Sequence, residues 1–342
     1  MACEIKDEAA KSALAGQGFA AELRELGRAI PHKGLFSVLL LAWLALFHFL
    51  GNGTFGYINT PSLFGWLQNI YNYSPDDESL GILIPILILG LLWWKRNDLA
   101  SAPKHIWWPA LILFGFAAAL HVVGYVVQQQ RVSLVALFLG LYGLMGVLWG
   151  WSWLKVTFFP LFLLAFLVPL PMDLEGMTLP LRLVSTKIAV TISHVLGIGD
   201  VAQHGARISH PVRQFGYDVE AACSGLRSLT VMTAMSCVFA FITFRSNWKR
   251  LVVIASAVPL AIASNSLRLL SIIIGGNWKY DQLRAAGMPL EEVRQGAQNF
   301  GSYIHEHTII KLVPYAIGFL CLMLLAKWLR DDVVDAPAKG TS

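Results

Sequence analysis

The sequence has little charge for its length. Only 14% of its 342 residues are Asp, Glu, Lys or Arg, whereas a soluble domain carries about 25%. Hydrophobic residues make up 56% of the chain and gather in repeated long runs. This composition excludes an ordinary soluble protein and predicts an all-α polytopic membrane protein.

Cysteine is also scarce, because the chain has only Cys3, Cys223, Cys237 and Cys321. No pair of them reads as a disulfide or forms a CxxC motif, and no His and Cys cluster has the spacing of a zinc site. We therefore expect no metal and no cofactor. The net charge of +5 accompanies no nucleic-acid motif, so we expect no nucleic acid as a partner. In a membrane protein such an excess sets the topology instead.

The N-terminal region lacks the features of a cleavable signal peptide. Residues 1–33 are polar and mixed in charge, and no small-residue cleavage site follows the first apolar run. We interpret 1–33 as a cytoplasmic tail, 34–330 as one transmembrane domain and 331–342 as a cytoplasmic C-terminal tail. By length and hydropathy the apolar runs predict eight spans, which are residues 34–50, 80–94, 106–127, 132–154, 156–172, 224–244, 251–274 and 308–329.

The distribution of basic residues favours a cytoplasmic N-terminus. The loop of residues 51–80 has no Lys or Arg, whereas the link between the sixth and seventh spans carries Arg245, Lys249 and Arg250. With the N-terminus in the cytoplasm, all the dense basic clusters fall on the cytoplasmic side, as the positive-inside rule requires.

A half-apolar stretch at residues 179–198 is interrupted by Arg182 and other polar side chains. A span here would reverse the side of every later segment, so we interpret it as an interfacial amphipathic helix. Alternating and β-branched residues predict a small β-hairpin within residues 200–220. Residues 179–222 are thus the predicted extracytoplasmic segment, and residues 223–329 hold the candidate catalytic helices.

Three polar residues are predicted to reach the outer face from three different spans. Cys223 directly precedes the sixth span, and His307 directly precedes the eighth. Arg268 lies 17 residues beyond Leu251, which is about 26 Å from the cytoplasmic end of the seventh span. An arginine within an apolar run is costly without a partner or a wet cavity. We therefore expect these three side chains to form one site at the outer interface.

This combination of residue types suits acyl transfer through a thioester. A cysteine at a helix N-terminus feels the positive end of the helix dipole, and a nearby guanidinium favours its thiolate form. A histidine can act as a base and then protonate a leaving amine, while an arginine stabilises a developing oxyanion. Gly225 leaves room for a peptide backbone, Arg227 shares the helix face of Cys223, and Asn265 shares that of Arg268.

Structural roles compete with this interpretation. A filler role for Cys223, a backbone-binding role for Arg268 and an interfacial role for the histidines all stay open. Glu220 and Ser224 either cap the helix or position Cys223.

With these residues in place, the sequence resembles exosortases of the exosortase/archaeosortase family, over roughly residues 80–330. The family hallmark is a motif like E-x-x-C-S-G-[IL]-R. The chain has the matching residues in the same order: Glu220, Cys223, Ser224, Gly225, Leu226 and Arg227. An N-x-x-R motif in the next helix of the family is matched by Asn265 and Arg268, and a late histidine is matched by His307 or His305.

The resemblance implies a membrane cysteine protease and transpeptidase of the bacterial inner membrane, with its active site on the extracytoplasmic side. The implied partners are membrane lipid and secreted proteins with a sorting tail, made of a Pro-Glu-Pro-like motif, a transmembrane helix and a basic end. By the same resemblance, Cys223 attacks the backbone carbonyl at the motif, His307 is the acid/base and Arg268 supports the tetrahedral intermediate.

One departure leaves the choice of histidine open. Many members carry a glycine four residues after the histidine, but here Lys311 follows His307 and Ile309 follows His305 at that spacing. We expect His307, because the last span begins directly after it. The long segment of residues 275–302 is predicted to be either an amphipathic helix over the site or an ordinary solvated loop.

Three other classes of function compete with the sorting protease. A transporter or channel would line its path with Arg268, although the early spans are nearly all apolar. A non-catalytic assembly protein of a surface-polymer pathway would not need the thiol of Cys223. A membrane acyltransferase would use the same thiol on lipid instead of peptide.

Overall fold

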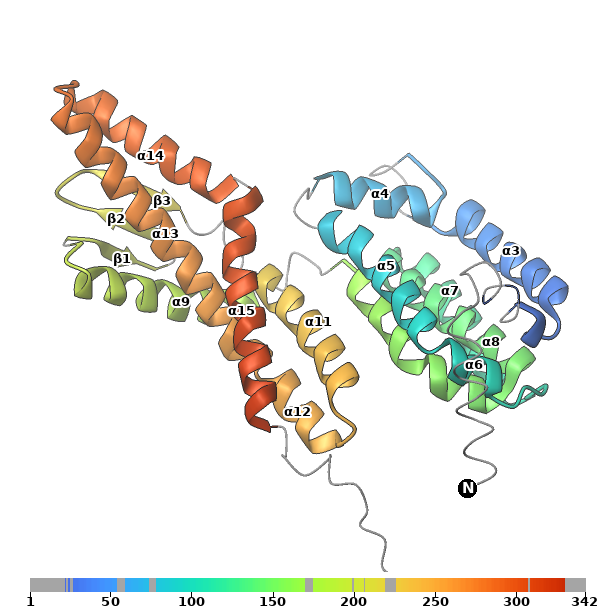
Figure 1. Cartoon of the computed structure of the whole chain (residues 1–342). Coiled ribbons are helices and arrows are strands. Elements are labelled where there is room, and N and C mark those ends of the chain that lie inside the picture. Colours follow the sequence, from blue (N-terminus) through green and yellow to red (C-terminus); the bar gives the residue numbers. More distant parts are fainter. Residues whose placement is uncertain are drawn as a thin grey trace, which may run out of the picture. The chain divides into compact units, whose positions relative to one another are not determined.

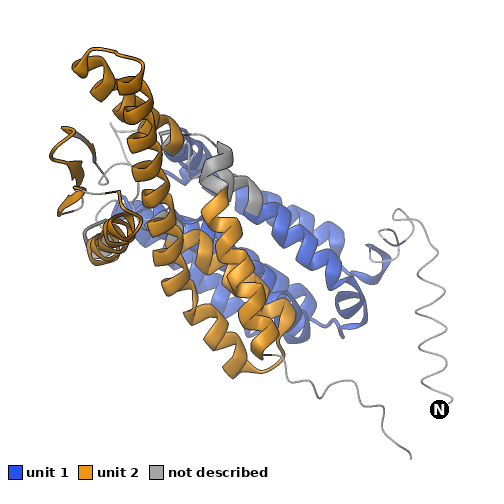
Figure 2. Cartoon of the chain, turned by 60° about the vertical axis from the view of Figure 1, so that its left-hand side comes forward, with its two compact units in different colours: residues 1–169 blue, residues 170–342 orange. Residues whose placement is uncertain are grey.

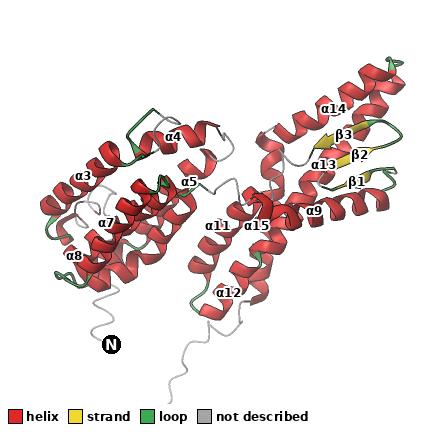
Figure 3. Ribbon diagram, turned by 180° about the vertical axis from the view of Figure 1, so that it is seen from behind, coloured by secondary structure: helices red, strands yellow, loops and turns green. Residues whose placement is uncertain are grey.

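The computed structural model describes Glu22, Arg24 and residues 27–53, 59–73, 78–169, 175–198, 200–205, 207–218, 226–306 and 308–329. The chain divides into two compact units, Met1–Pro169 and Leu170–Ser342 (Figure 2). Helices make up most of both units (Figure 3). The all-α class predicted from composition is therefore confirmed.

Unit 1 is a set of helices that follow one another along the chain (Figure 1). They are α3 (Lys33–Leu50), α4 (Leu63–Tyr73), α5 (Glu78–Trp94), α6 (Arg96–Ser101), α7 (Ala110–Val126), α8 (Gln130–Phe162) and the 3₁₀ helix η1 (Leu163–Leu167). The sequence predicts only a loop where α4 lies. The loop prediction missed α4 because its 11 residues are too few for a membrane span, although Leu63 and Trp66, three residues apart, are both buried.

The long helix α8 reverses direction at Gly150, whose backbone has φ 85° and ψ 177°. The phenol of Tyr142 donates a hydrogen bond to the carbonyl of Leu154 at 2.7 Å. In a straight helix these two residues would lie about 18 Å apart, so the arms before and after Gly150 are antiparallel. The sequence predicts two spans in this region, with the break near residue 155. The structure moves the break to Gly150, since glycine adopts a positive φ without strain.

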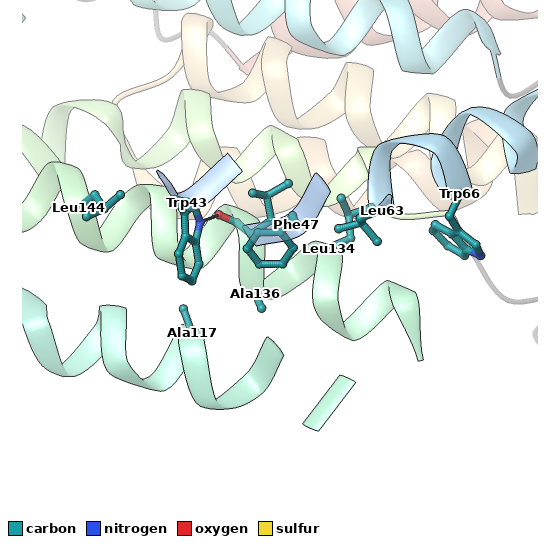
Figure 4. Close-up of a cluster of buried hydrophobic side chains, with 9 residues drawn as sticks. Trp43, Phe47, Leu63, Trp66, Ala117, Leu134, Ala136 and Leu144 are labelled. Carbon is teal, nitrogen blue, oxygen red and sulfur yellow. Dashed lines mark hydrogen bonds between the residues drawn. The ribbon is translucent and has the colours of Figure 1, made fainter. Parts of the chain in front are cut away.

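The core of unit 1 lies between α3, α4, α7 and α8 (Figure 4). Its buried members are Trp43, Phe47, Leu63, Trp66, Ala117, Leu134, Ala136, Leu137 and Leu144. Trp43 Nε1 donates a hydrogen bond to the carbonyl of Leu137 at 3.1 Å. Gly140 makes room for this indole, because a Cβ at that position would lie 2.1 Å from the ring.

Unit 2 combines helices with a small sheet. Its elements are α9 (Glu175–Val195), β1 (Ala202–His204), β2 (Arg207–His210), β3 (Phe215–Asp218), α11 (Leu226–Thr243), α12 (Asn247–Ala255), α13 (Ala257–Ala285), α14 (Leu290–Glu306) and α15 (Thr308–Leu329).

The sheet is antiparallel, with strand order β1-β2-β3 and Ile208 paired with Gln203 on one side and Tyr217 on the other. Where the sequence predicts a two-stranded hairpin, the structure has three strands. The turn after β2 carries Arg213, which forms a salt bridge of 2.8 Å with Asp281 of α13. This contact fastens the sheet to the C-terminal part of α13.

Helix α13 continues to Ala285, beyond the predicted end of its span at residue 274. Its extension packs against α14, which returns antiparallel to it (Figure 1). A Cβ on Gly275 would lie 2.1 Å from Ile304, and one on Gly296 would lie 2.4 Å from Leu283. The close packing of α13 against α14 explains why α13 continues beyond the end of its apolar run. Of the two alternatives for residues 275–302, an amphipathic helix or a solvated loop, the structure has a helix, α14, which runs from Leu290 to Glu306.

Among the described residues, three helical stretches are long and apolar enough to cross a membrane: Lys33–Leu50, Gln130–Leu167 and Asn247–Ala285. Shorter apolar helices cover Ile84–Trp94, Ala110–Val126, Leu229–Thr243 and Val313–Leu329. The reversal at Gly150 divides the second long stretch into two arms. The chain is therefore a transmembrane protein, and the count of eight spans stays a prediction.

Candidate active site

A cluster of polar side chains is buried in the middle of α13. Ser264, Asn265, Ser266 and Arg268 are all largely hidden from solvent, with Asn265 only 2% and Arg268 only 7% exposed. The surrounding sequence is otherwise apolar, so hydropathy alone would not place these groups inside the protein. Charged and amide side chains in membrane helices commonly face the protein interior rather than lipid, and the burial of Arg268 and Asn265 fits this pattern.

Helix α11 runs antiparallel to α13 and begins at the level of Arg268. Met232 packs against Ala261 in one buried cluster. Arg268 lies seven residues beyond Ala261, and the first residue of α11, Leu226, lies six residues before Met232. Both steps correspond to about 10 Å along a helix axis. The N-terminal turn of α11 therefore lies at the level of Arg268 along the helix axes.

Helix α15 reaches the same level. Tyr315 packs against the cluster that contains Met232 and Ala261, and a Cβ on Gly318 would lie 2.2 Å from the methyl group of Met232. Helix α15 begins at Thr308, seven residues before Tyr315, which is again about 10 Å. The first residues of two helices thus come to the height of the buried arginine.

The structure describes some of the predicted site residues and not others. Arg268 and Asn265 are described and lie together on α13. The backbone of Arg227 lies in the first turn of α11, and that of His305 lies in the last turn of α14. Outside the described residues are Glu220, Cys223, Ser224, Gly225 and His307.

The end of α14 bears on the choice between the two histidines. His305 follows Ile304, which packs on Gly275, about 10 Å farther along α13 than Arg268. His307 stands between the end of α14 and the start of α15 at Thr308. Along the helix axes, the start of α15 next to His307 therefore lies closer to the level of Arg268 than does the turn of α14 that carries His305.

Helix α9 contributes polar side chains that the sequence analysis did not place at the site. Arg182, Ser185 and Thr186 are all buried. Ser266 Oγ donates a hydrogen bond to the carbonyl of Ser185 at 3.2 Å, and Ser185 Oγ donates to the carbonyl of Ile262 at 3.4 Å. These two bonds, named here the Ser185–Ser266 link, fix α9 against α13 beside Asn265.

The interfacial role predicted for residues 179–198 therefore captures only part of α9. The side chains at 182, 185, 186, 189, 190 and 193 are buried, which is the spacing of one helix face. This face packs on α13 between Ile262 and Ile273. Because Arg182 interrupts the apolar run, the hydropathy of the segment did not indicate a buried helix. The helical spacing of the small and apolar residues of α9 could have revealed the buried face.

Several buried polar atoms along this contact lack hydrogen-bond partners in the described part of the chain. They are both amide atoms of Asn265, Ser264 Oγ and Thr186 Oγ1. Leaving such a group unpaired costs about 1–3 kcal/mol, so native proteins satisfy them with protein, water or ligand. Asn265 can both donate to and accept from a bound peptide group. The arrangement is chemically suited to binding a polar segment.

The turn after β2 places a second charged group, Arg213, against the extension of α13. Arg213 Nη1 donates to the carbonyl of Asn277 at 3.3 Å, and its guanidinium lies 4.7 Å from the ring centre of Tyr280. Burial, with help from the positive charge of Arg213, lowers the pKa of His210 below its ordinary value, against the opposite influence of Asp200 and Asp281. His210 is therefore held in its neutral form within the sheet.

Basic residues of the segment 275–302 make contacts within their own helices. Lys279 Nζ donates to Gln282 Oε1 at 2.9 Å, and Arg294 forms a 3.5 Å ion pair with Glu291. Among the residues that the structure describes, no group of three or more His, Cys, Asp or Glu side chains is placed to hold a metal ion.

The chain matches a protein-family model. The model of the family described as Transmembrane exosortase (Exosortase_EpsH) matches residues 66–288, which is more than half of the chain. The matched region includes the positions of Cys223, Asn265 and Arg268 and ends before both candidate histidines. No curated protein and no solved structure matches the chain.

Proposed function

The chain belongs to the transmembrane exosortase family, and from this premise we propose that it is a membrane cysteine transpeptidase. It cleaves a C-terminal sorting tail, composed of a Pro-Glu-Pro-like motif, an apolar helix and a basic end, from secreted proteins. The observation that carries the proposal is the burial of Arg268 and Asn265 at the height where α11 and α15 begin. The sequence puts Cys223 and His307 next to those two helix starts.

The reaction follows from the chemistry of these side chains. The thiolate of Cys223 attacks the carbonyl carbon of the scissile peptide bond, and the guanidinium of Arg268 stabilises the oxyanion that forms. The acid/base histidine, His307 in the preferred assignment, protonates the leaving amine of the tail. The C–N bond breaks and a thioester remains on Cys223. An acceptor amine or water, deprotonated by the same histidine, then attacks the thioester and releases the thiol.

The proposed topology has eight spans, a cytoplasmic N-terminus and the site on the extracytoplasmic side of a bacterial inner membrane. Two features support it. The basic link between α11 and α12 lies at the opposite end of α11 from Leu226, as the positive-inside rule expects. A secreted protein anchored by its tail would also present the motif at the outer interface, where Cys223 is predicted.

The direct test is Cys223→Ala in the full chain, co-expressed with a secreted reporter that carries such a tail. We expect the reporter to remain at full length, because no other cysteine of the chain is predicted to lie at the site. Cys321→Ala is the matched control, since Cys321 is an exposed cysteine of α15, and it should process the reporter normally. The same assay on His305→Gln and His307→Gln identifies the acid/base. Undiminished processing by Cys223→Ala would refute the proposal.

A further inference from the structure

Exposed aromatic side chains gather where the extension of α13 packs against α14 (Figure 1). We define the aromatic patch as Trp278 of α13 with Phe300 and Tyr303 of α14. We propose that this patch, with Lys279 beside it, binds the Pro-Glu-Pro-like motif of the sorting tail. The inference rests on the proposed function and names the residues that recognise its substrate.

The three rings of the aromatic patch form one continuous apolar surface. The ring centroids of Trp278 and Phe300 lie 5.8 Å apart, and those of Phe300 and Tyr303, which are stacked, lie 6.1 Å apart. Trp278 is 57% exposed and Tyr303 is 53% exposed. Large aromatic side chains that touch one another and stay exposed are typical of an interaction site rather than of a core.

The level of the patch favours a ligand from the extracytoplasmic side over membrane lipid. Helices α11 and α15 begin at the level of Arg268, where the outer interface is predicted. Trp278 lies ten residues farther along α13, which is about 15 Å. The pair of α13 and α14 extends past the start of α15 (Figure 1). The rings therefore stand outside the predicted hydrocarbon layer, where lipid tails do not cover them.

The patch also lies close enough to the catalytic level for one short segment to reach both. A Cβ on Gly275 would lie 3.5 Å from the ring of Phe300, and Gly275 is seven residues beyond Arg268, or about 10 Å. Tyr303 lies four residues before His307 in the sequence. Three residues in a polyproline II conformation span about 9 Å. A motif seated on the rings thus delivers the residues that follow it to the level of Arg268.

The chemistry of the motif matches the rings. Segments rich in proline adopt the polyproline II conformation and dock on surfaces lined by aromatic side chains. In that conformation, residues two positions apart are separated by about 6 Å, which is the spacing of neighbouring rings in the patch. The two prolines of a Pro-Glu-Pro motif can therefore lie on adjacent rings.

Lys279 supplies a charge that complements the glutamate of the motif. Its Nζ atom lies 5.8 Å from the ring centroid of Phe300 and donates to Gln282 Oε1. Both of these partners are neutral, so neither compensates the positive charge. A glutamate between two ring-bound prolines is thus brought next to an ammonium group.

The experiment measures processing in proteoliposomes that contain the full chain, with the amount of reporter varied so that KM and kcat are obtained separately. One reporter carries the Pro-Glu-Pro tail, and a second has Ala-Glu-Ala in its place. We expect the wild type to have an about 10-fold lower KM for the proline reporter, because the loss of contacts to a buried aromatic anchor commonly has an effect of this size. Trp278→Ala and Tyr303→Ala should remove most of this difference by raising KM for the proline reporter, with kcat nearly unchanged.

A third reporter, with Pro-Gln-Pro, tests the charge. The wild type should prefer the Glu reporter about 2- to 5-fold over the Gln reporter, which is the range for an exposed ion pair. Lys279→Gln should lose this preference and keep the preference for proline over alanine.

Two controls separate recognition from structure. Trp328→Ala removes an 80% exposed tryptophan near the other end of α15 and should leave KM unchanged for every reporter. Trp278→Phe keeps an aromatic ring at the patch and should keep part of the preference for proline.

Three results would overturn the inference. Equal KM values of the wild type for the Pro-Glu-Pro and Ala-Glu-Ala reporters would do so without any variant. A Trp278→Ala enzyme with the full wild-type preference would do so as well. A rise in KM of equal size for both reporters would assign the patch to lipid contact instead. All three leave the proposed function intact as long as Cys223→Ala remains inactive, whereas processing by Cys223→Ala would refute the proposed function itself.

Discussion

In unit 1 the buried imidazole of His121 forms a 3.2 Å hydrogen bond with the hydroxyl of Ser133, whereas in unit 2 the buried amide of Asn265 has no hydrogen-bond partner among the described residues. Unit 1 also buries two unpartnered donors, Gln130 Nε2 and Trp153 Nε1, but they lie on different arms of α8. In unit 2 the unpartnered atoms of Thr186, Ser264 and Asn265 share the contact between α9 and α13, while others lie on Ser236, Asn277 and Arg294.

The two units therefore use their buried polar groups for different purposes. The buried polar groups of unit 1 mainly join its helices, as Trp43 joins α3 to α8 through the carbonyl of Leu137. In unit 2 the groups of Thr186, Ser264 and Asn265 lie along the contact that also carries Arg268, and they have hydrogen-bonding capacity left unused among the described residues. Unsatisfied buried groups lower stability, so their concentration at one place is typical of a site prepared for a ligand.

The largest expected effect on stability is that of Trp43→Ala in unit 1. The indole is buried against Phe47 and Phe114 and bonded to α8, so its loss should cost about 3–5 kcal/mol of unfolding free energy. Thermal or denaturant unfolding of the protein in detergent measures this loss. Trp108→Ala, at an exposed position, is the matched control and should change stability little.

Trp43→Ala should leave the activity of the folded enzyme intact. Processing of the reporter, normalised to the amount of folded enzyme, should match the wild type, because the site lies in unit 2. A large fall in this normalised activity would show that unit 1 takes part in the chemistry.

Asn265→Leu should have a smaller effect on stability and in the opposite direction. Removing an unpartnered amide from a buried position relieves its desolvation cost, so the unfolding free energy should stay level or rise by about 1–3 kcal/mol. Reporter processing should nevertheless fall, because the amide has no hydrogen-bond partner in the described part of the chain and can serve a ligand.

Ser266→Ala is the matched variant for this prediction. The hydroxyl of Ser266 donates to the carbonyls of Ser185 and Ile262, so its removal should lower stability by about 1 kcal/mol. Parallel unfolding curves of the two variants test the contrast in sign. A loss of stability in Asn265→Leu as large as that in Ser266→Ala would mean that the amide supports the fold.

Much of the fold was predictable, because long apolar runs determine where the helices of a membrane protein lie. The break in α8 was misplaced, since residues 150 and 155 both interrupt the run and only the backbone of Gly150 shows which one turns the chain. The length of α13 was underestimated, because its last turns are held by contacts with α14, such as that of Gly275 with Ile304. Such long-range packing leaves no mark on local hydropathy.

The candidate site was predictable in part for the same reason. A lone arginine in an apolar run stands out, so Arg268 was recognised from sequence and is buried as expected. Arg182 stands among more polar neighbours and was interpreted as interfacial. Its burial depends on the Ser185–Ser266 link, which brings together residues about 80 positions apart, as long-range contacts commonly do.

The smallest predicted effect is a pH dependence of local stability. It is expected in the sheet of unit 2 and not in the helices of either unit. Burial and Arg213 lower the pKa of His210, so protons bind more readily when the sheet opens than when it is closed. The stability that this neutral imidazole supports is present above its ordinary pKa of 6.5 and is lost as the pH falls through the lowered value. Hydrogen exchange at the amides of β2 should therefore accelerate, relative to intrinsic rates, as the pH falls below 6.5, while exchange in α8 should not. His210→Gln should abolish this acceleration, and an equal acceleration in the variant would assign the pH response to another group.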